Sequence, residues 1–263
     1  MKKGILFFLF FYFFNSYLFA HFQLIYTQES ALKNGKKIEL KEVFTHPFTD
    51  EYTMDMEGVE EFYVVNKGKK TDLIKTLEPI TFQGNNDKGK AYSSKYKASR
   101  MGDHLFVLVP KPYYDKISDE YIQQYTKMVL NVAGPPSDWD TELKLDAEIV
   151  PLTKPYAIWT NSNFTGIVKQ KGKPVPYAKV YVEYLNRDVD TKNNKMGPSK
   201  IEAPQGSFLS LEIKANKDGE FTFSIPKAGW WGFCAKEVGA KKEYKGKKLT
   251  QDSVIWVQAK DMK

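Results

Sequence analysis

The chain has 263 residues, a formal net charge of +7 and one cysteine, Cys234, so no disulfide can form within it. The positive excess is carried by lysines, with arginine only at Arg100 and Arg187, whereas nucleic-acid-binding surfaces normally use arginine for bidentate contacts. We therefore expect no nucleic-acid partner and a fold whose stability comes from its apolar core.

The first 20 residues have the order that is typical of a secretory signal peptide. Lys2 and Lys3 precede an apolar run from Ile5 to Phe14, and Ala20 supplies a small residue at the expected cut. Cleavage after Ala20 would make His21 the first residue of a periplasmic chain. No later segment approaches the ~20 apolar residues that a spanning helix needs, so we expect that the cleaved chain does not span a membrane.

Short runs of aromatic and β-branched residues, separated by glycine, proline, asparagine and lysine turns, predict strands throughout the remainder. In the first half these are Phe22–Tyr26, Lys37–Phe44, Glu61–Val65, Pro79–Gln83, Ala91–Ala98 and His104–Val109. Residues 118–131 suit either a helix or a buried strand, and the surrounding β pattern favours a strand. In the second half the predicted strands are Phe164–Gln170, Ala178–Leu185, Phe208–Ala215, Phe221–Ile225, Gly229–Lys236 and Ser253–Gln258.

The spacing of these strands predicts an all-β chain with two β-sandwich domains in tandem, of the immunoglobulin-like kind. A glycine-proline segment near residues 133–137 marks the boundary between them. The predicted organisation is a signal peptide at 1–20, an N-terminal metal-binding sandwich at 21–136, a connecting segment at 137–162 and a C-terminal sandwich at 163–263.

The chain has only three histidines, and each lies at the end of a predicted strand. His21 opens the first strand, His46 follows the second and precedes Pro47, and His104 begins a later strand. The ends of strands are where a sandwich can gather side chains on one rim. An α-amine has a pKa near ~8 and an imidazole near ~6.5, so both can lose their protons to a metal close to neutral pH.

An amino-terminal chelate with further imidazoles suits Ni(II) or Cu(II), whose affinities for nitrogen ligands rank high. Met54 adds a soft thioether beside His46, although most methionines fill gaps in cores. The predicted metal ligands are therefore His21, His46, His104 and Met54. The sequence carries no Gly-x-Ser-x-Gly elbow and no His-Glu-x-x-His helix, so we expect that the protein is not an enzyme.

Several segments together resemble the periplasmic family that accompanies nickel energy-coupling-factor (ECF) uptake systems, the NikK type. In the C-terminal half they are Glu148–Tyr156, Gly172–Pro176, Val182–Asn186, Ile225–Phe233 and Val254–Val257. In the N-terminal half they are His21-Phe22, Phe44–Phe48 and Gly102–Phe106.

The resemblance implies a pair of β-sandwiches, the second of which is similar to a transthyretin-like or carboxypeptidase-regulatory-like module over residues 166–226. It also implies nickel capture by the N-terminal histidine and a histidine before proline, here His21 and His46. The role of His104 rests on its spacing alone. Relatives carry a glycine before the methionine where this chain has Thr53, so the resemblance does not fix the role of Met54. It also implies membrane subunits of a nickel ECF transporter as partners.

The predicted function is capture of Ni(II), as the free ion or as a small metal chelate, for delivery to a membrane transporter. Two alternatives remain open. One is a histidine-brace copper protein, either a Cu(II) carrier or a monooxygenase. The other is a structural or adhesive sandwich without metal, because fold does not fix function.

Overall fold

The computed structural model describes residues 21–262, so the predicted signal peptide at 1–20 lies outside the described residues. Strands joined by turns make up nearly all of the regular structure, with two short 3-10 helices, η1 (Ile74–Thr76) and η2 (Gly206–Phe208). The all-β prediction is confirmed. Between residues 21 and 262, no helix is long and apolar enough to cross a bilayer.

The first layer is a seven-stranded sheet in the order β1-β3-β8-β7-β18-β17, with β4 beside β3. Its strands are β1 (Phe22–Tyr26), β3 (Lys36–Thr45), β4 (Thr53–Met54), β7 (Glu78–Gln83), β8 (Lys88–Ala98), β17 (Arg187–Asp190) and β18 (Lys195–Ser199). Most of this layer comes from the first half of the chain, and the β17–β18 hairpin from the second half extends its edge.

The middle layer is a twelve-stranded sheet in the order β19-β16-β21-β23-β11-β9-β5-β6, with β2, β10, β13 and β22 as short additions. Its long strands are β5 (Val59–Asn66), β6 (Lys69–Asp72), β9 (Gly102–Pro110), β11 (Glu120–Val132), β16 (Lys179–Tyr184), β19 (Leu211–Lys214), β21 (Gly229–Ala235) and β23 (Lys247–Lys260). The short ones are β2 (Ala31–Leu32), β10 (Tyr113–Asp115), β13 (Ile158–Trp159) and β22 (Glu243–Tyr244). The ambiguous segment 118–131 is thus a strand, as the β context predicted.

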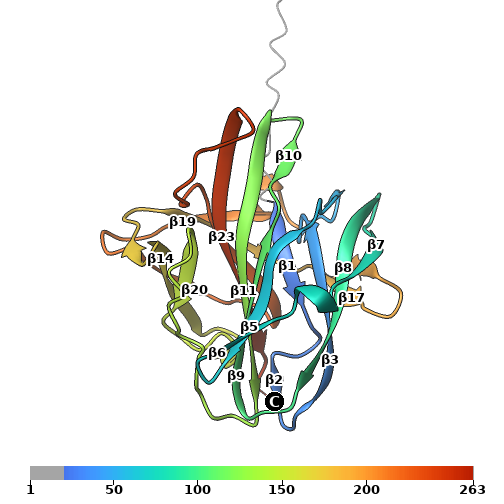
Figure 1. The fold of residues 1–263 in the computed structure, drawn as a ribbon, viewed down its shortest axis with the longest axis vertical. Helices are drawn as coiled ribbons and strands as arrows, with labels where there is room; N and C mark the ends of the chain where they lie inside the picture. The colour runs from blue at the N-terminus through green and yellow to red at the C-terminus, as the bar shows by residue number, and fades with distance from the viewer. Residues whose placement is uncertain (1–20, 263) are drawn as a thin grey trace, which may run out of the picture.

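The third layer is a four-stranded sheet in the order β12-β14-β15, with β20 beside β14. Its strands are β12 (Glu148–Pro151), β14 (Asn163–Gln170), β15 (Lys173–Pro174) and β20 (Glu220–Ser224). In Figure 1 this sheet lies to the left, the long strands β23 and β11 run side by side in the middle, and β3, β8 and β7 lie to the right.

The central strands of the middle sheet, β23, β11 and β9, are buried on both faces and separate two hydrophobic cores. Along β23, Val254 and Trp256 pack into the core shared with the first layer, whereas Ile255 and Val257 pack into the core shared with the third. This alternation follows from the two-residue period of a strand, and burial on both faces gives the strand its continuous apolar run. The two predicted β-sandwiches are therefore present, and they share their central sheet.

Candidate metal centre

Strand register places His21 beside His46. β1 and β3 are antiparallel, with Phe22 opposite Thr45, and one further step along this register puts the two histidines opposite each other. Their ring centroids lie 4.8 Å apart, edge to face at 67°. The structure thus brings together two of the three predicted histidines, and their role as metal ligands stays a prediction.

Strand β4 extends this row of side chains on the other side of β3. Thr45 pairs with Thr53, so the next step places Tyr52 beside His46, and their ring centroids are 5.9 Å apart. Met54 is buried and lines the same cleft as both histidines. Met54 pairs with Phe44, whose ring centroid is 5.7 Å from that of His21, and its role as a ligand stays a prediction.

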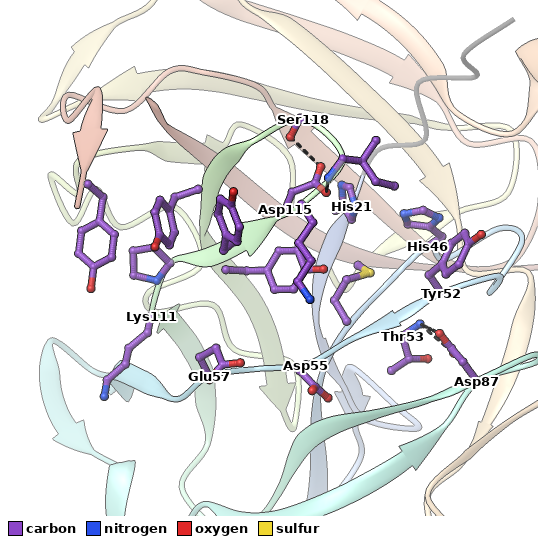
Figure 2. Close-up of a pocket in the computed structure, with 18 of the residues that line it drawn as sticks. His21, His46, Tyr52, Thr53, Asp55, Glu57, Asp87, Lys111, Asp115 and Ser118 are labelled. Carbon is purple, nitrogen blue, oxygen red and sulfur yellow. Dashed lines mark hydrogen bonds between the residues drawn. The ribbon is translucent and has the colours of Figure 1, made fainter. Parts of the chain in front are cut away.

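The histidine pair lies in an open cleft of about 1010 Å³. Figure 2 shows His21 and His46 next to each other, with Asp115 beside His21 and Tyr52 beside His46. Lys111 and Glu57 lie across the view from His46. The cleft is reached from solvent and is far larger than a metal ion requires.

Asp115 supplies a carboxylate close to the histidines, which the sequence reading did not single out. It accepts hydrogen bonds from Ser118 Oγ at 2.7 Å and from the Ile117 amide at 2.9 Å. Although burial acts in the opposite direction, these bonds hold the pKa of Asp115 below its ordinary value, so it is ionised at neutral pH. The aspartate-x-x-serine spacing of the β10–β11 turn is the signal that could have identified it.

Both imidazoles of the pair are neutral at physiological pH. Burial lowers the pKa of His21 to about 4, and the positive charge of Lys236 adds to this effect while Asp115 opposes it. Burial also lowers the pKa of His46 to about 3, with a further contribution from His21. A neutral imidazole offers a nitrogen lone pair, which is the form that binds metals.

Gln124 fixes the backbone on both sides of Phe22. Its buried side-chain amide donates to the His21 carbonyl oxygen at 2.7 Å and accepts from the Gln23 amide at 2.6 Å. The same Nε2 lies 3.1 Å from Asp252 Oδ2, so Gln124 is itself held in place. This arrangement anchors the first residue that would remain after cleavage.

His104 is not part of this cleft, which corrects the expectation that three histidines gather on one rim. It lies opposite Leu130 on β11, whereas Ile122 of β11 pairs with Tyr113 at the cleft. These two positions on β11 are eight residues apart, or roughly 27 Å at about 3.4 Å per residue. Both ring nitrogens of His104 are already engaged, one with the Tyr96 hydroxyl at 3.0 Å and one with the Arg100 carbonyl at 2.9 Å.

The side chains alone do not complete a metal site. In the part of the chain that the structure describes, no three His, Cys, Asp or Glu side chains converge as a metal-binding group. The cleft offers two imidazoles and the Met54 thioether, so a third nitrogen donor would have to be the α-amine of a chain that begins at His21. Cys234 is buried, and burial raises the pKa of its thiol well above the ordinary value, so it suits a structural role.

Comparison with solved structures returns β-domain proteins at low similarity. The D0-D1 domain of intimin is 10% identical, with 89% of this chain and 97% of that chain covered and a TM-score of 0.23. The Yersinia pseudotuberculosis adhesin InvE is 11% identical, with coverage of 89% and 58% and a TM-score of 0.25. The fibronectin(III)-like modules of Clostridium thermocellum CbhA are 10% identical, with coverage of 90% and 95% and a TM-score of 0.19.

TM-scores this far below 0.5 carry no argument about this chain. No curated protein matches it. Residues 18–239 match the family described as a domain of unknown function, DUF4198, and this match spans most of the chain. The protein therefore belongs to the DUF4198 family.

Proposed function

We propose that the mature protein is a periplasmic carrier that binds Ni(II) through the α-amine and imidazole of His21 together with the imidazole of His46. The observation that carries this proposal is the contact between the two rings, 4.8 Å apart at the base of an open cleft. Delivery to a membrane nickel transporter of the ECF type is part of the same proposal and is supported by the sequence resemblance.

The donor set suits a cargo ion better than a permanent structural ion. Structural metal sites normally enclose the ion with a complete set of protein ligands. Here three nitrogen donors would leave other coordination positions open toward the cleft, so that incoming and outgoing ligands can exchange. We therefore propose binding and transfer rather than catalysis.

Copper is the second candidate, because the same nitrogen donors bind Cu(II) more tightly than Ni(II) in the general order of metal affinities. The nearby thioether of Met54 would also suit Cu(I). Nickel is preferred because of the resemblance to nickel uptake systems. A direct comparison of the two metals on one protein preparation distinguishes the candidates.

The test is a calorimetric titration of the protein that begins at His21, with Ni(II) and in parallel with Cu(II). We expect one Ni(II) per chain, and we expect His46→Ala to weaken binding at least about 100-fold through loss of one nitrogen donor, because removal of outer-shell partners alone costs about 10–100-fold. His104→Asn is the matched control and should leave the affinity unchanged. Absence of binding in the unaltered protein would favour the metal-free structural alternative.

A further inference from the structure

The cleft around the histidine pair has the size of a site for an organic molecule. Its volume of about 1010 Å³ lies at the upper end of the range that small-molecule sites normally occupy, about 300–1,000 Å³. An ion held by three nitrogen atoms would fill only its base. The remaining space therefore has room for an occupant that is larger than a hydrated ion.

Three of the four carboxylates that line the cleft already accept hydrogen bonds from the protein. The four lining carboxylates are Asp55, Glu57, Asp87 and Asp115. Asp55 accepts from the Lys90 amide at 2.7 Å, and both oxygens of Asp87 accept from the Thr53 amide at 3.0 Å. Asp115 is held by its own turn. Glu57 lies across the cleft from His46 (Figure 2).

The ammonium groups that line the cleft, in contrast, do not pair with carboxylates of the described part of the protein. The lining lysines are Lys88, Lys111, Lys116 and Lys245. Within residues 21–262, no ion pair joins any of these four to a carboxylate, whereas their neighbours Lys90, Lys247 and Lys248 do form such pairs. The charged donors left available for a ligand are therefore these four ammonium groups, and each can donate hydrogen bonds to a carboxylate of the occupant.

Tyrosine rings form one side of the same cleft. Tyr114 and Tyr121 have ring centroids 5.1 Å apart, and Tyr121 and Tyr244 have centroids 5.0 Å apart. Tyr113 also lines the cleft, on the side of the histidine pair, with its ring centroid 6.4 Å from that of His21. Such a wall gives apolar contact to the carbon skeleton of a ligand, while the lysines contact its charged groups.

We propose that the cargo enters this cleft as a complex of Ni(II) with a carboxylate-bearing chelator rather than as the hydrated ion. This inference rests on the proposed function, because His21 and His46 take coordination positions that the chelator leaves to water. In that step nickel–water bonds break, nickel–nitrogen bonds form, and the α-ammonium proton passes to solvent. The lysines pair with the carboxylates of the chelator, and the tyrosine wall packs against its carbon atoms.

Citrate serves as the probe. The protein that begins at His21 is dialysed against Ni(II) alone, citrate alone and an equimolar mixture of the two, and retained nickel and citrate are counted. Capture of a hydrated ion predicts that citrate competes and lowers the retained nickel. Capture of a complex predicts that nickel is retained undiminished together with about one citrate per chain, and that citrate alone is retained much less.

A triple variant and its matched control locate the effect. Lys111→Gln, Lys116→Gln and Lys245→Gln together should weaken retention of citrate with nickel about tenfold, as expected for three solvent-exposed ion pairs, and should change binding of Ni(II) alone by less than about twofold. Lys69→Gln, Lys75→Gln and Lys97→Gln alter the net charge equally on exposed residues outside the cleft and should change neither.

Each other outcome has a defined meaning. Nickel bound without citrate, or citrate loss caused equally by both triple variants, overturns the inference and leaves the proposed function standing. Citrate retained equally with and without nickel also overturns it. If neither Ni(II) nor the mixture is retained, the proposed function itself fails.

Discussion

Replacing Gln124 with alanine tests whether its buried amide holds the first residue of the mature chain in position. The side chain bonds the His21 carbonyl at 2.7 Å and the Gln23 amide at 2.6 Å. A hydrogen bond contributes about 1 kcal/mol net, and each buried group left unpaired costs about 1–3 kcal/mol. Two groups lose their partner, so we expect Gln124→Ala to lower the free energy of unfolding by about 2–6 kcal/mol.

Gln124→Ala should also weaken Ni(II) binding, because His21 is then less fixed before the metal binds and part of the binding free energy is used to order it. Loss of the single bond to His21, about 1 kcal/mol, corresponds to about fivefold weaker Ni(II) binding, since about 1.4 kcal/mol is a factor of ten. The affinity is measured by calorimetry and the unfolding free energy by urea denaturation, both on the protein that begins at His21.

Gln123→Ala is the matched control. Gln123 is equally buried and donates to Glu60 Oε2 at 3.0 Å and to the Pro110 carbonyl at 2.9 Å, but it makes no recorded bond to residues 21–26. It should lose similar stability and keep its affinity for Ni(II). Equal loss of affinity in both variants, or unchanged affinity in Gln124→Ala, would refute the anchoring role.

Since the pKa values of His21 and His46 are lowered to about 4 and about 3, only the α-amine, with a pKa near ~8, must lose a proton to bind metal between pH 7 and pH 5. Ni(II) affinity should fall about tenfold per pH unit there, with about one proton released per metal in calorimetry across several buffers; release of two or more would contradict this. Met54→Leu keeps the side-chain volume and should weaken Cu(I) binding at least about tenfold while Ni(II) binding changes by less than about twofold, as measured by competition with a chromogenic chelator. Burial raises the pKa of Glu42 from its ordinary value of 4.5 to about 8, so Glu42 is protonated in the folded protein at neutral pH. As the pH rises above 4.5, Glu42 of the unfolded chain loses its proton, and keeping it protonated in the fold lowers the free energy of unfolding by a growing amount. Glu42→Gln should therefore stabilise the fold by up to about 3 kcal/mol at pH 7 and by almost nothing at pH 4.5 in urea denaturation.

The strands were largely predictable, because alternation of apolar and polar residues reports local geometry. Residues 22–26 and 37–44 were expected as strands and form β1 and most of β3. The contact between His21 and His46 depends on the register between these two strands, which alternation of apolar and polar residues does not determine. The connection at residues 27–35 sets that register, and within this connection β2 pairs with β11 in the middle sheet.

The position of His104 shows the same limit more sharply. The sequence correctly places His104 near the end of a strand. A strand has two ends, however, and the direction of the strand within the sheet decides at which rim of the sandwich His104 lies. β9 runs antiparallel to β11, so its first residues pair with the far end of β11. The position of Asp115 beside the histidines could not be predicted for a related reason. The neighbours of a residue at a turn are determined by distant strands that pack around it.

The most direct test of the account compares two proteins that differ only at the N-terminal nitrogen. Both begin at His21, and in the second the α-amine is acetylated, so that it has the same imidazoles but an amide in place of the α-amine. The account predicts that acetylation weakens Ni(II) binding at least about 100-fold, because it removes a ligand and loss of outer-shell partners alone costs about 10–100-fold, while thermal stability without metal is unchanged. Equal affinity of the two proteins would contradict the amino-terminal chelate on which the proposed function depends.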